Sequence, residues 1–158
     1  MSGPEARRGW GAAAALALGV ILLDQLTKGL VRGSLEPGER VDLFLGIDLA
    51  YVSNRGIAFG FLGDGGALVL VVTIVALGVM LAWFAAAPSR PGLWIAVGLL
   101  TGGALGNLID RIRIDAVTDF IDPPLWPAFN VADIAITFGA VALILSVLRG
   151  DRPQPATE

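Results

Sequence analysis

Four aspartates, Asp24, Asp110, Asp119 and Asp133, are the residues best suited to carry chemistry, because each lies within or beside a long apolar stretch. The chain has no His and no Cys, which excludes thiol nucleophiles, Ser–His pairs and Cys/His zinc sites. Two carboxylates held together can share one proton, so that one acts as a general base for water and the other as a general acid. That chemistry suits peptide hydrolysis. Clustered aspartates also bind Mg²⁺ or Ca²⁺, and the residue types alone leave both interpretations open.

Further polar residues recur at helical spacing near these aspartates. The sets that share one helix face are Asp24 with Lys28, Asn107 with Asp110 and Arg111, and Asn130 with Asp133 and Thr137. Ionisable groups inside a membrane are energetically unfavourable and usually mark a function. Structural roles are the alternative: an internal ion pair between Asp24 and Lys28, a pairing that involves Asp110 and Arg111, and a helix N-cap at Asn130 followed by the first-turn acid Asp133.

Four apolar segments must position these side chains, at about residues 10–31, 67–87, 93–109 and 131–148. The whole chain of 158 residues is 55% apolar and only 16% charged, with a mean hydropathy of +0.74. A soluble domain has about 25% charged residues, and a helix that crosses a bilayer needs about 20 apolar ones. We therefore expect an all-α membrane protein, a single domain over residues 1–158 with four transmembrane helices. The net charge of −3 argues against a nucleic-acid partner.

The orientation in the membrane follows from the charges that flank the first segment. Arg7 and Arg8 precede it and a lone Arg32 follows it, so the positive-inside rule places both termini in the cytoplasm. In this orientation the polar ends of the four segments meet near the outer membrane face. Small residues at Gly98, Gly102 and Gly106 form a stripe against which another helix can pack closely.

The connection between the first two apolar segments is too long, at 35 residues, to be a simple link. Its part from Val41 to Val52 predicts one or two short strands. We expect a small β platform over about residues 36–60 on the outer membrane surface, and a disordered tail over residues 150–158.

Five segments of this sequence resemble the signature segments of bacterial lipoprotein signal peptidase, also called signal peptidase II, and occur in the family's order. They are Asp24-Gln25-Leu26-Thr27-Lys28, Asn54-Arg55-Gly56-Ile57-Ala58-Phe59, the segment from Gly102 to Arg111, Val117-Thr118-Asp119-Phe120, and Phe129-Asn130-Val131-Ala132-Asp133. Together they are specific to the family, whereas any single one would be a weak signal. The interval between Asp119 and Asp133 is shorter than is usual for the family.

The resemblance implies an intramembrane aspartyl endopeptidase of the bacterial inner membrane. Such an enzyme removes the signal peptide of prolipoproteins by cleaving just before a diacylglyceryl-modified Cys. The resemblance identifies Asp119 and Asp133 as the catalytic dyad, a choice among the four aspartates that spacing alone does not make. It identifies the residues that line the site as Asp24, Lys28, Asn54, Asn107, Asp110, Arg111 and Asn130. No metal or other cofactor is implied, and we expect a monomer whose partners are the substrate and membrane lipid.

A small proton-coupled membrane transporter is the alternative from another class, since it would also carry acidic residues in its helices. We would expect such a protein to have acids near the bilayer midplane and internal repeats, which this sequence lacks. A divalent-cation-binding membrane protein is a third possibility.

Overall fold

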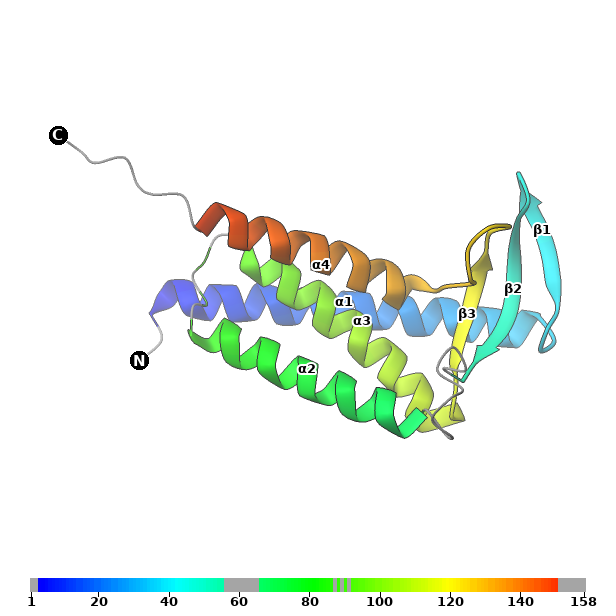
Figure 1. The fold of residues 1–158 in the computed structure, drawn as a ribbon, viewed down its shortest axis with the longest axis horizontal. Helices are drawn as coiled ribbons and strands as arrows, with labels where there is room; N and C mark the ends of the chain where they lie inside the picture. The colour runs from blue at the N-terminus through cyan, green and yellow to red at the C-terminus, as the bar shows by residue number, and fades with distance from the viewer. Residues whose placement is uncertain (1–2, 56–65, 87, 89, 91, 151–158) are drawn as a thin grey trace.

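The computed structural model describes residues 3–55, 66–86, 88, 90 and 92–150. In chain order the elements are α1 (Pro4–Ser34), β1 (Arg40–Phe44), β2 (Ile47–Asn54), α2 (Gly66–Ala86), α3 (Leu93–Ile114), β3 (Val117–Asp122) and α4 (Val131–Gly150). The helices lie side by side as a bundle, and the three strands cross one of its ends, roughly perpendicular to α1 (Figure 1). Residues 56–60 of the expected platform and the tail beyond residue 150 lie outside the described residues.

All four predicted helices are present; α4 extends two residues beyond its expected end, and α1 and α3 are clearly longer than expected. α1 has 31 residues, or about 46 Å at 1.5 Å per residue, which exceeds the roughly 30 Å hydrocarbon core of a bilayer. α3 continues past the predicted end at residue 109 to Ile114, because the charges of Asp110 and Arg111 find partners inside the protein. Within the described part of the chain, the helices long and apolar enough to cross a membrane are α1, α3 and α4, over Pro4–Ser34, Leu93–Ile114 and Val131–Leu148. α2 has 21 residues, and its segment Leu70–Ala86 is apolar but shorter.

α3 is the central helix, because its glycines allow α1 and α4 to approach it on two sides. A Cβ atom added at Gly98 or Gly102 would lie 3.0 Å or less from atoms of α1, so the predicted small-residue stripe is a packing surface for that helix. Gly103 lies on another face, where a Cβ would come within 2.5 Å of the carbonyl oxygen of Ala132 in α4. The close packing of these three helices sets the distances between their polar side chains.

The strands form an antiparallel sheet in the order β1-β2-β3. Where one or two short strands were predicted between residues 41 and 52, the structure has two, β1 and β2, which form a hairpin with Phe44 opposite Ile47. The sequence predicted no strand between the third and fourth apolar segments, yet Val117–Asp122 forms β3, which pairs with β2 and places Val52 opposite Asp119. This pairing joins segments far apart in sequence, and the short, mostly buried strand lacks the alternation of polar and apolar residues that would have marked it.

Candidate active site

Buried polar side chains gather at the end of the bundle where α1, α3 and α4 meet the sheet. Six of the nine predicted site residues are buried there, and the other three, Asn54, Arg111 and Asp133, are hydrogen-bonded directly to buried members. The buried polar residues at this end are Asp24, Lys28, Asn107, Asp110, Thr118, Asp119 and Asn130. These side chains therefore point into the protein rather than towards its outer surface.

Lys28 is the centre of one half of this cluster. Its Nζ lies 2.9 Å from Asp24 Oδ2, 3.4 Å from Asp110 Oδ2 and 2.8 Å from Asn107 Oδ1. An ammonium group has three donors, so these three acceptors satisfy it completely. The ion pair between Asp24 and Lys28 that their spacing predicted is thus present, and it extends to α3 through two more contacts.

Asp24 also fixes the start of α4. Its Oδ1 accepts a hydrogen bond of 2.9 Å from the backbone N–H of Ala132, in the first turn of that helix. A carboxylate at this place satisfies a free amide and interacts favourably with the helix dipole. The close approach depends on Gly106, because a Cβ there would lie 2.6 Å from Asp24 Oδ2.

Asp110 connects α3 to β3. Its Oδ2 accepts a hydrogen bond of 3.0 Å from the backbone N–H of Thr118, and its Oδ1 lies 3.2 Å from Arg32 Nη1. Arg32 also donates to Thr118 Oγ1 at 2.9 Å. Asp110 therefore forms its ion pairs with Lys28 and Arg32, whereas Arg111 donates to the carbonyl oxygen of Asn107.

Three residues that were not predicted from the sequence, Gln25, Arg32 and Thr118, complete this half of the cluster. Gln25 donates to Asp110 Oδ1 at 3.3 Å and to the carbonyl oxygen of Gly106 at 3.1 Å. Arg32 follows Lys28 by four residues, so helical spacing could have placed it on the same face. Thr118 could not have been found this way, because its role depends on the position of β3.

Asp119 and Asp133 form the other half and are linked through Asn130. Asn130 Nδ2 donates to Asp119 Oδ1 at 2.6 Å, and the Asn130 backbone N–H donates to Asp133 Oδ2 at 3.2 Å. Asp133 N–H donates in return to Asn130 Oδ1 at 3.0 Å, so the predicted N-cap at Asn130 is confirmed. One residue thus caps α4 and holds both carboxylates.

Two further amides occupy the remaining carboxylate oxygens. Asn54, the last residue of β2, donates to Asp119 Oδ2 at 2.9 Å. Asn107 donates to Asp133 Oδ1 at 2.9 Å, while its own Oδ1 accepts from Lys28 and from Asn130. Asn107 therefore joins the ion-pair half of the cluster to the half that holds Asp119 and Asp133.

The surroundings raise the pKa of Asp119 from 3.8 to about 6. Burial is the main cause, since it disfavours the ionised carboxylate, and the nearby charge of Asp133 adds to it. The hydrogen bonds from Asn54 and Asn130 act in the opposite direction. Asp119 therefore holds a proton at mildly acidic pH, as one member of a proton-sharing pair must.

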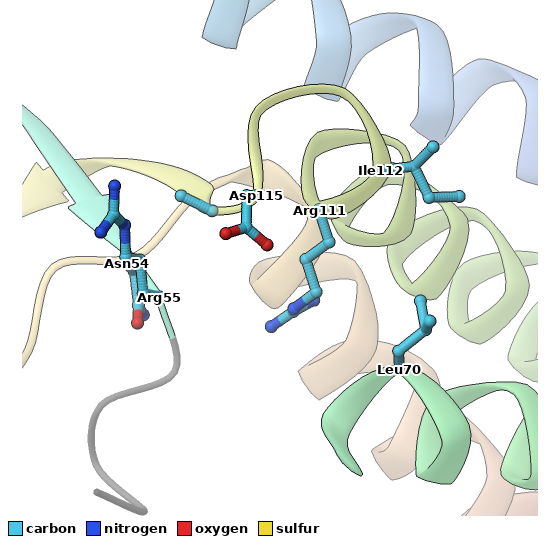
Figure 2. Close-up of a pocket in the computed structure, with 7 residues that line it drawn as sticks. Asn54, Arg55, Leu70, Arg111, Ile112 and Asp115 are labelled. Carbon is cyan, nitrogen blue, oxygen red and sulfur yellow. The ribbon is translucent and has the colours of Figure 1, made fainter. Parts of the chain in front are cut away.

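A pocket of about 270 Å³ is lined by Asn54, the residue that donates to Asp119, although Asp119 and Asp133 themselves do not line it. It lies between the end of β2, the last turns of α3 and the start of α2, and its lining includes Asn54, Arg55, Arg111 and Leu70. Figure 2 shows the Arg111 side chain extending from α3 into the space between Arg55 and Leu70. The charge of Arg111 interacts with those of Asp133 and Asp119, so the pocket adjoins the carboxylate pair. Gly56 to Phe59, the rest of the segment that follows Asn54, lie outside the described residues.

Comparison with known proteins gives a consistent result. The family model described as signal peptidase (SPase) II matches residues 16–149. A lipoprotein signal peptidase of Moorella thermoacetica is 42% identical over 135 residues, which cover 84% of this chain and 90% of that protein. A lipoprotein signal peptidase of Nitratidesulfovibrio vulgaris is 44% identical over 149 residues, which cover 88% of this chain and 90% of that protein. A solved structure described as a bacterial membrane enzyme is 29% identical, with a TM-score of 0.82 and coverage of 90% of this chain and 95% of that one.

Proposed function

This chain belongs to the signal peptidase II family, and we propose that it is an aspartic-type endopeptidase that removes the signal peptides of prolipoproteins. It would cleave the bond just before a diacylglyceryl-modified Cys. One observation carries the proposal: buried Asp119 and the first-turn Asp133 share Asn130 as a hydrogen-bond partner, and Asn54, which donates to Asp119, lines a pocket. The predicted lining residues Asp24, Lys28, Asn54, Asn107, Asp110, Arg111 and Asn130 would support the pair or contact the substrate.

The chemistry assigned to the pair needs one proton shared between the two carboxylates. The raised pKa of Asp119 favours it as the member that carries the proton and donates it to the oxygen of the scissile carbonyl. Ionised Asp133 would accept a proton from a water molecule as the water oxygen attacks the carbonyl carbon. When the carbon–nitrogen bond breaks, Asp133 gives its proton to the leaving nitrogen, and Asp119 takes a proton back from a hydroxyl of the tetrahedral intermediate as the carbonyl forms again, so the pair returns to its starting state.

The proposed chemistry requires that the two carboxylates be held in a constant relative position. Asp119 lies on β3 and Asp133 on α4, so two elements must keep a constant relation for the pair to work. The contacts of Asp110 with Thr118 and of Asp24 with Ala132 hold these two elements to α3 and α1. We propose that the ion-pair half of the cluster positions the carboxylates and does not itself react.

We also propose how the protein is oriented in the membrane. All four helices would cross the bacterial inner membrane, with both termini in the cytoplasm and the carboxylate pair near the outer face. Cys introduced in place of Ser34 or Ser53, both exposed, should react with an impermeant maleimide added to intact cells. Cys in place of Ser89 should not react. The reverse pattern would put the carboxylates on the cytoplasmic side.

The substrate would then reach the site sideways from the bilayer, as a signal helix. Burial of an acyl chain contributes about 0.8 kcal/mol per CH₂, so two chains on the Cys outweigh any single side-chain contact in setting the depth of the scissile bond. We expect the same prolipoprotein without its diacylglyceryl group to be cleaved very poorly. Equal rates for the two forms at matched membrane concentration would indicate a general intramembrane protease.

The decisive experiment uses purified protein in detergent with a lipidated prolipoprotein, followed by a gel-shift assay. Asp119→Asn and Asp133→Asn should each abolish cleavage, because an amide cannot share a proton in the required way. Asp42→Asn, at an exposed position of β1, is the matched control and should cleave normally. Near-normal turnover by either active-site variant would remove that residue from the chemistry. Absence of cleavage by the unmodified chain would instead favour a transporter.

A further inference from the structure

One corner of the sheet exposes large apolar side chains. The β1–β2 hairpin turns at Leu45 and Gly46, and Leu45 is 88% exposed. The loop between β3 and α4 lies against this turn, since a Cβ on Gly46 would be 3.8 Å from Pro124 Cγ. In that loop Leu125 is 95% exposed and Trp126 is 70% exposed. Two segments far apart in sequence thus bring apolar side chains to one place, which we call the apolar corner.

The residue types at this corner are unfavourable for a turn in water. Leu45 and Gly46 have φ angles of 53° and 77°, as the two central residues of a two-residue hairpin turn do. Asn, Asp and Gly are preferred at such positions, and Leu is disfavoured because its Cβ is crowded in this conformation. Leu45 adopts a backbone conformation that is unfavourable for Leu, and its side chain is also exposed. This combination indicates that the turn does not face water. Residues 43–47 and 123–129 contain no charged residue.

The position of the corner suggests what surrounds it. The hairpin tip extends sideways beyond the neighbouring end of α4, rather than continuing along the helix axes (Figure 1). α4 exposes an apolar surface on its outside, which includes Phe138 at 63% and Leu148 at 61%. If the helices cross a bilayer, lipid surrounds that surface, and the corner lies over the same lipid at the level where the bundle ends.

We propose that the apolar corner inserts into the interfacial region of the outer leaflet and anchors the sheet to the membrane. Trp is enriched at this depth because its ring is apolar and its N–H remains able to bond to polar headgroups. The partner is therefore the lipid surface rather than another protein. The inference rests on the membrane disposition in the proposed function and adds a specific contact surface. Insertion of the corner would hold β2 and β3, which carry Asn54 and Asp119, at a constant depth relative to the bilayer.

Spin-label accessibility tests this directly, since the chain has no Cys of its own. Leu45→Cys and Trp126→Cys would each carry a nitroxide in protein reconstituted into nanodiscs. Glu39→Cys, just before β1 and away from the hairpin tip, is the exposed control. We expect a severalfold lower accessibility to a water-soluble nickel complex at positions 45 and 126 than at position 39, together with higher accessibility to oxygen.

The possible outcomes separate the alternatives. Accessibility to the nickel complex equal to that of the control would put the corner in water and overturn the inference. Protection from both reagents would mean that a protein or a second copy covers the corner, which also overturns the inference.

The variant Leu45→Asn provides a second test, because Asn suits the turn and the variant should fold. It should make the label at position 126 severalfold more accessible to nickel, and no change would show that the two segments do not insert together.

The same reconstituted variants can be tested for cleavage of a lipidated prolipoprotein. Cleavage with a water-exposed corner would overturn only the anchoring inference. An inserted corner without cleavage by the unmodified chain would overturn only the proposed function.

Discussion

Replacement of Asp119 by Asn should change how the stability of the protein depends on pH. The folded state raises the pKa of this carboxyl from 3.8 to about 6, so it binds the proton more tightly than the unfolded chain does. Below pH 3.8 both states are protonated and the group has no effect. As the pH rises towards 6 the unfolded chain ionises first, and above 6 the folded state carries the full penalty. At about 1.4 kcal/mol per pH unit, this penalty is about 3 kcal/mol.

The Asn variant cannot ionise, so it should escape this penalty. Its free energy of unfolding relative to the unmodified chain should therefore rise by about 2–3 kcal/mol between pH 4 and pH 8. The Asn amide nitrogen would face a donor from Asn54 or Asn130, which lowers stability by an amount that does not depend on pH. The quantity to measure is therefore how the difference in unfolding free energy between the variant and the unmodified chain changes with pH, rather than the size of that difference at one pH.

The assay is equilibrium unfolding in detergent micelles at several pH values, followed by the fluorescence of the four Trp residues. Asp42→Asn, exposed on β1, should differ from the unmodified chain by no more than about 0.5 kcal/mol at every pH. Parallel pH profiles for the unmodified chain and Asp119→Asn would refute the reasoning. They would mean that Asp119 is not desolvated in the folded protein, and that its role as the protonated member of the pair has no physical basis.

Further predictions concern the support of the site and its pH dependence. Lys28→Met should lower the free energy of unfolding by about 3–5 kcal/mol, because it leaves the two carboxylates it joins buried without their partner; an unchanged melt would show that Lys28 is dispensable. Gly103→Ala should destabilise by about 1–3 kcal/mol, since its Cβ would lie 2.5 Å from the carbonyl oxygen of Ala132. Gly29→Ala, with open space around its Cβ, is the control and should melt no lower than the unmodified chain. Because the raised pKa of Asp119 keeps its proton only up to about pH 6, kcat/KM should fall as the pH rises through that value, and a rate that rises there would contradict the assignment of the acid. EDTA should leave cleavage unchanged, whereas a loss reversed by Mg²⁺ would favour a metal site.

The sequence by itself determined the helices and the small set of residues that could carry chemistry. Long apolar segments can be read from composition, because a helix satisfies its own backbone and its apolar length is a local property. Local spacing likewise identified Asp24 with Lys28 as a pair and Asn130 as an N-cap. The choice of Asp119 and Asp133 came from the resemblance to a family rather than from spacing, since four aspartates met the same physical criteria.

Only the tertiary structure decided how these residues meet. Asn54 and Asp119 are 65 positions apart and touch because β3 pairs with β2, a contact for which no local pattern exists. Asp110 was expected at a helix end, but its bonds to Lys28, Arg32 and Thr118 allow α3 to continue beyond it. Asn130 could be read as a cap, yet its bond to Asp119 depends on α4 starting beside β3. Hydropathy and helical periodicity describe neighbours within one segment, whereas the carboxylate pair is assembled from side chains whose distances are set by the packing of different segments.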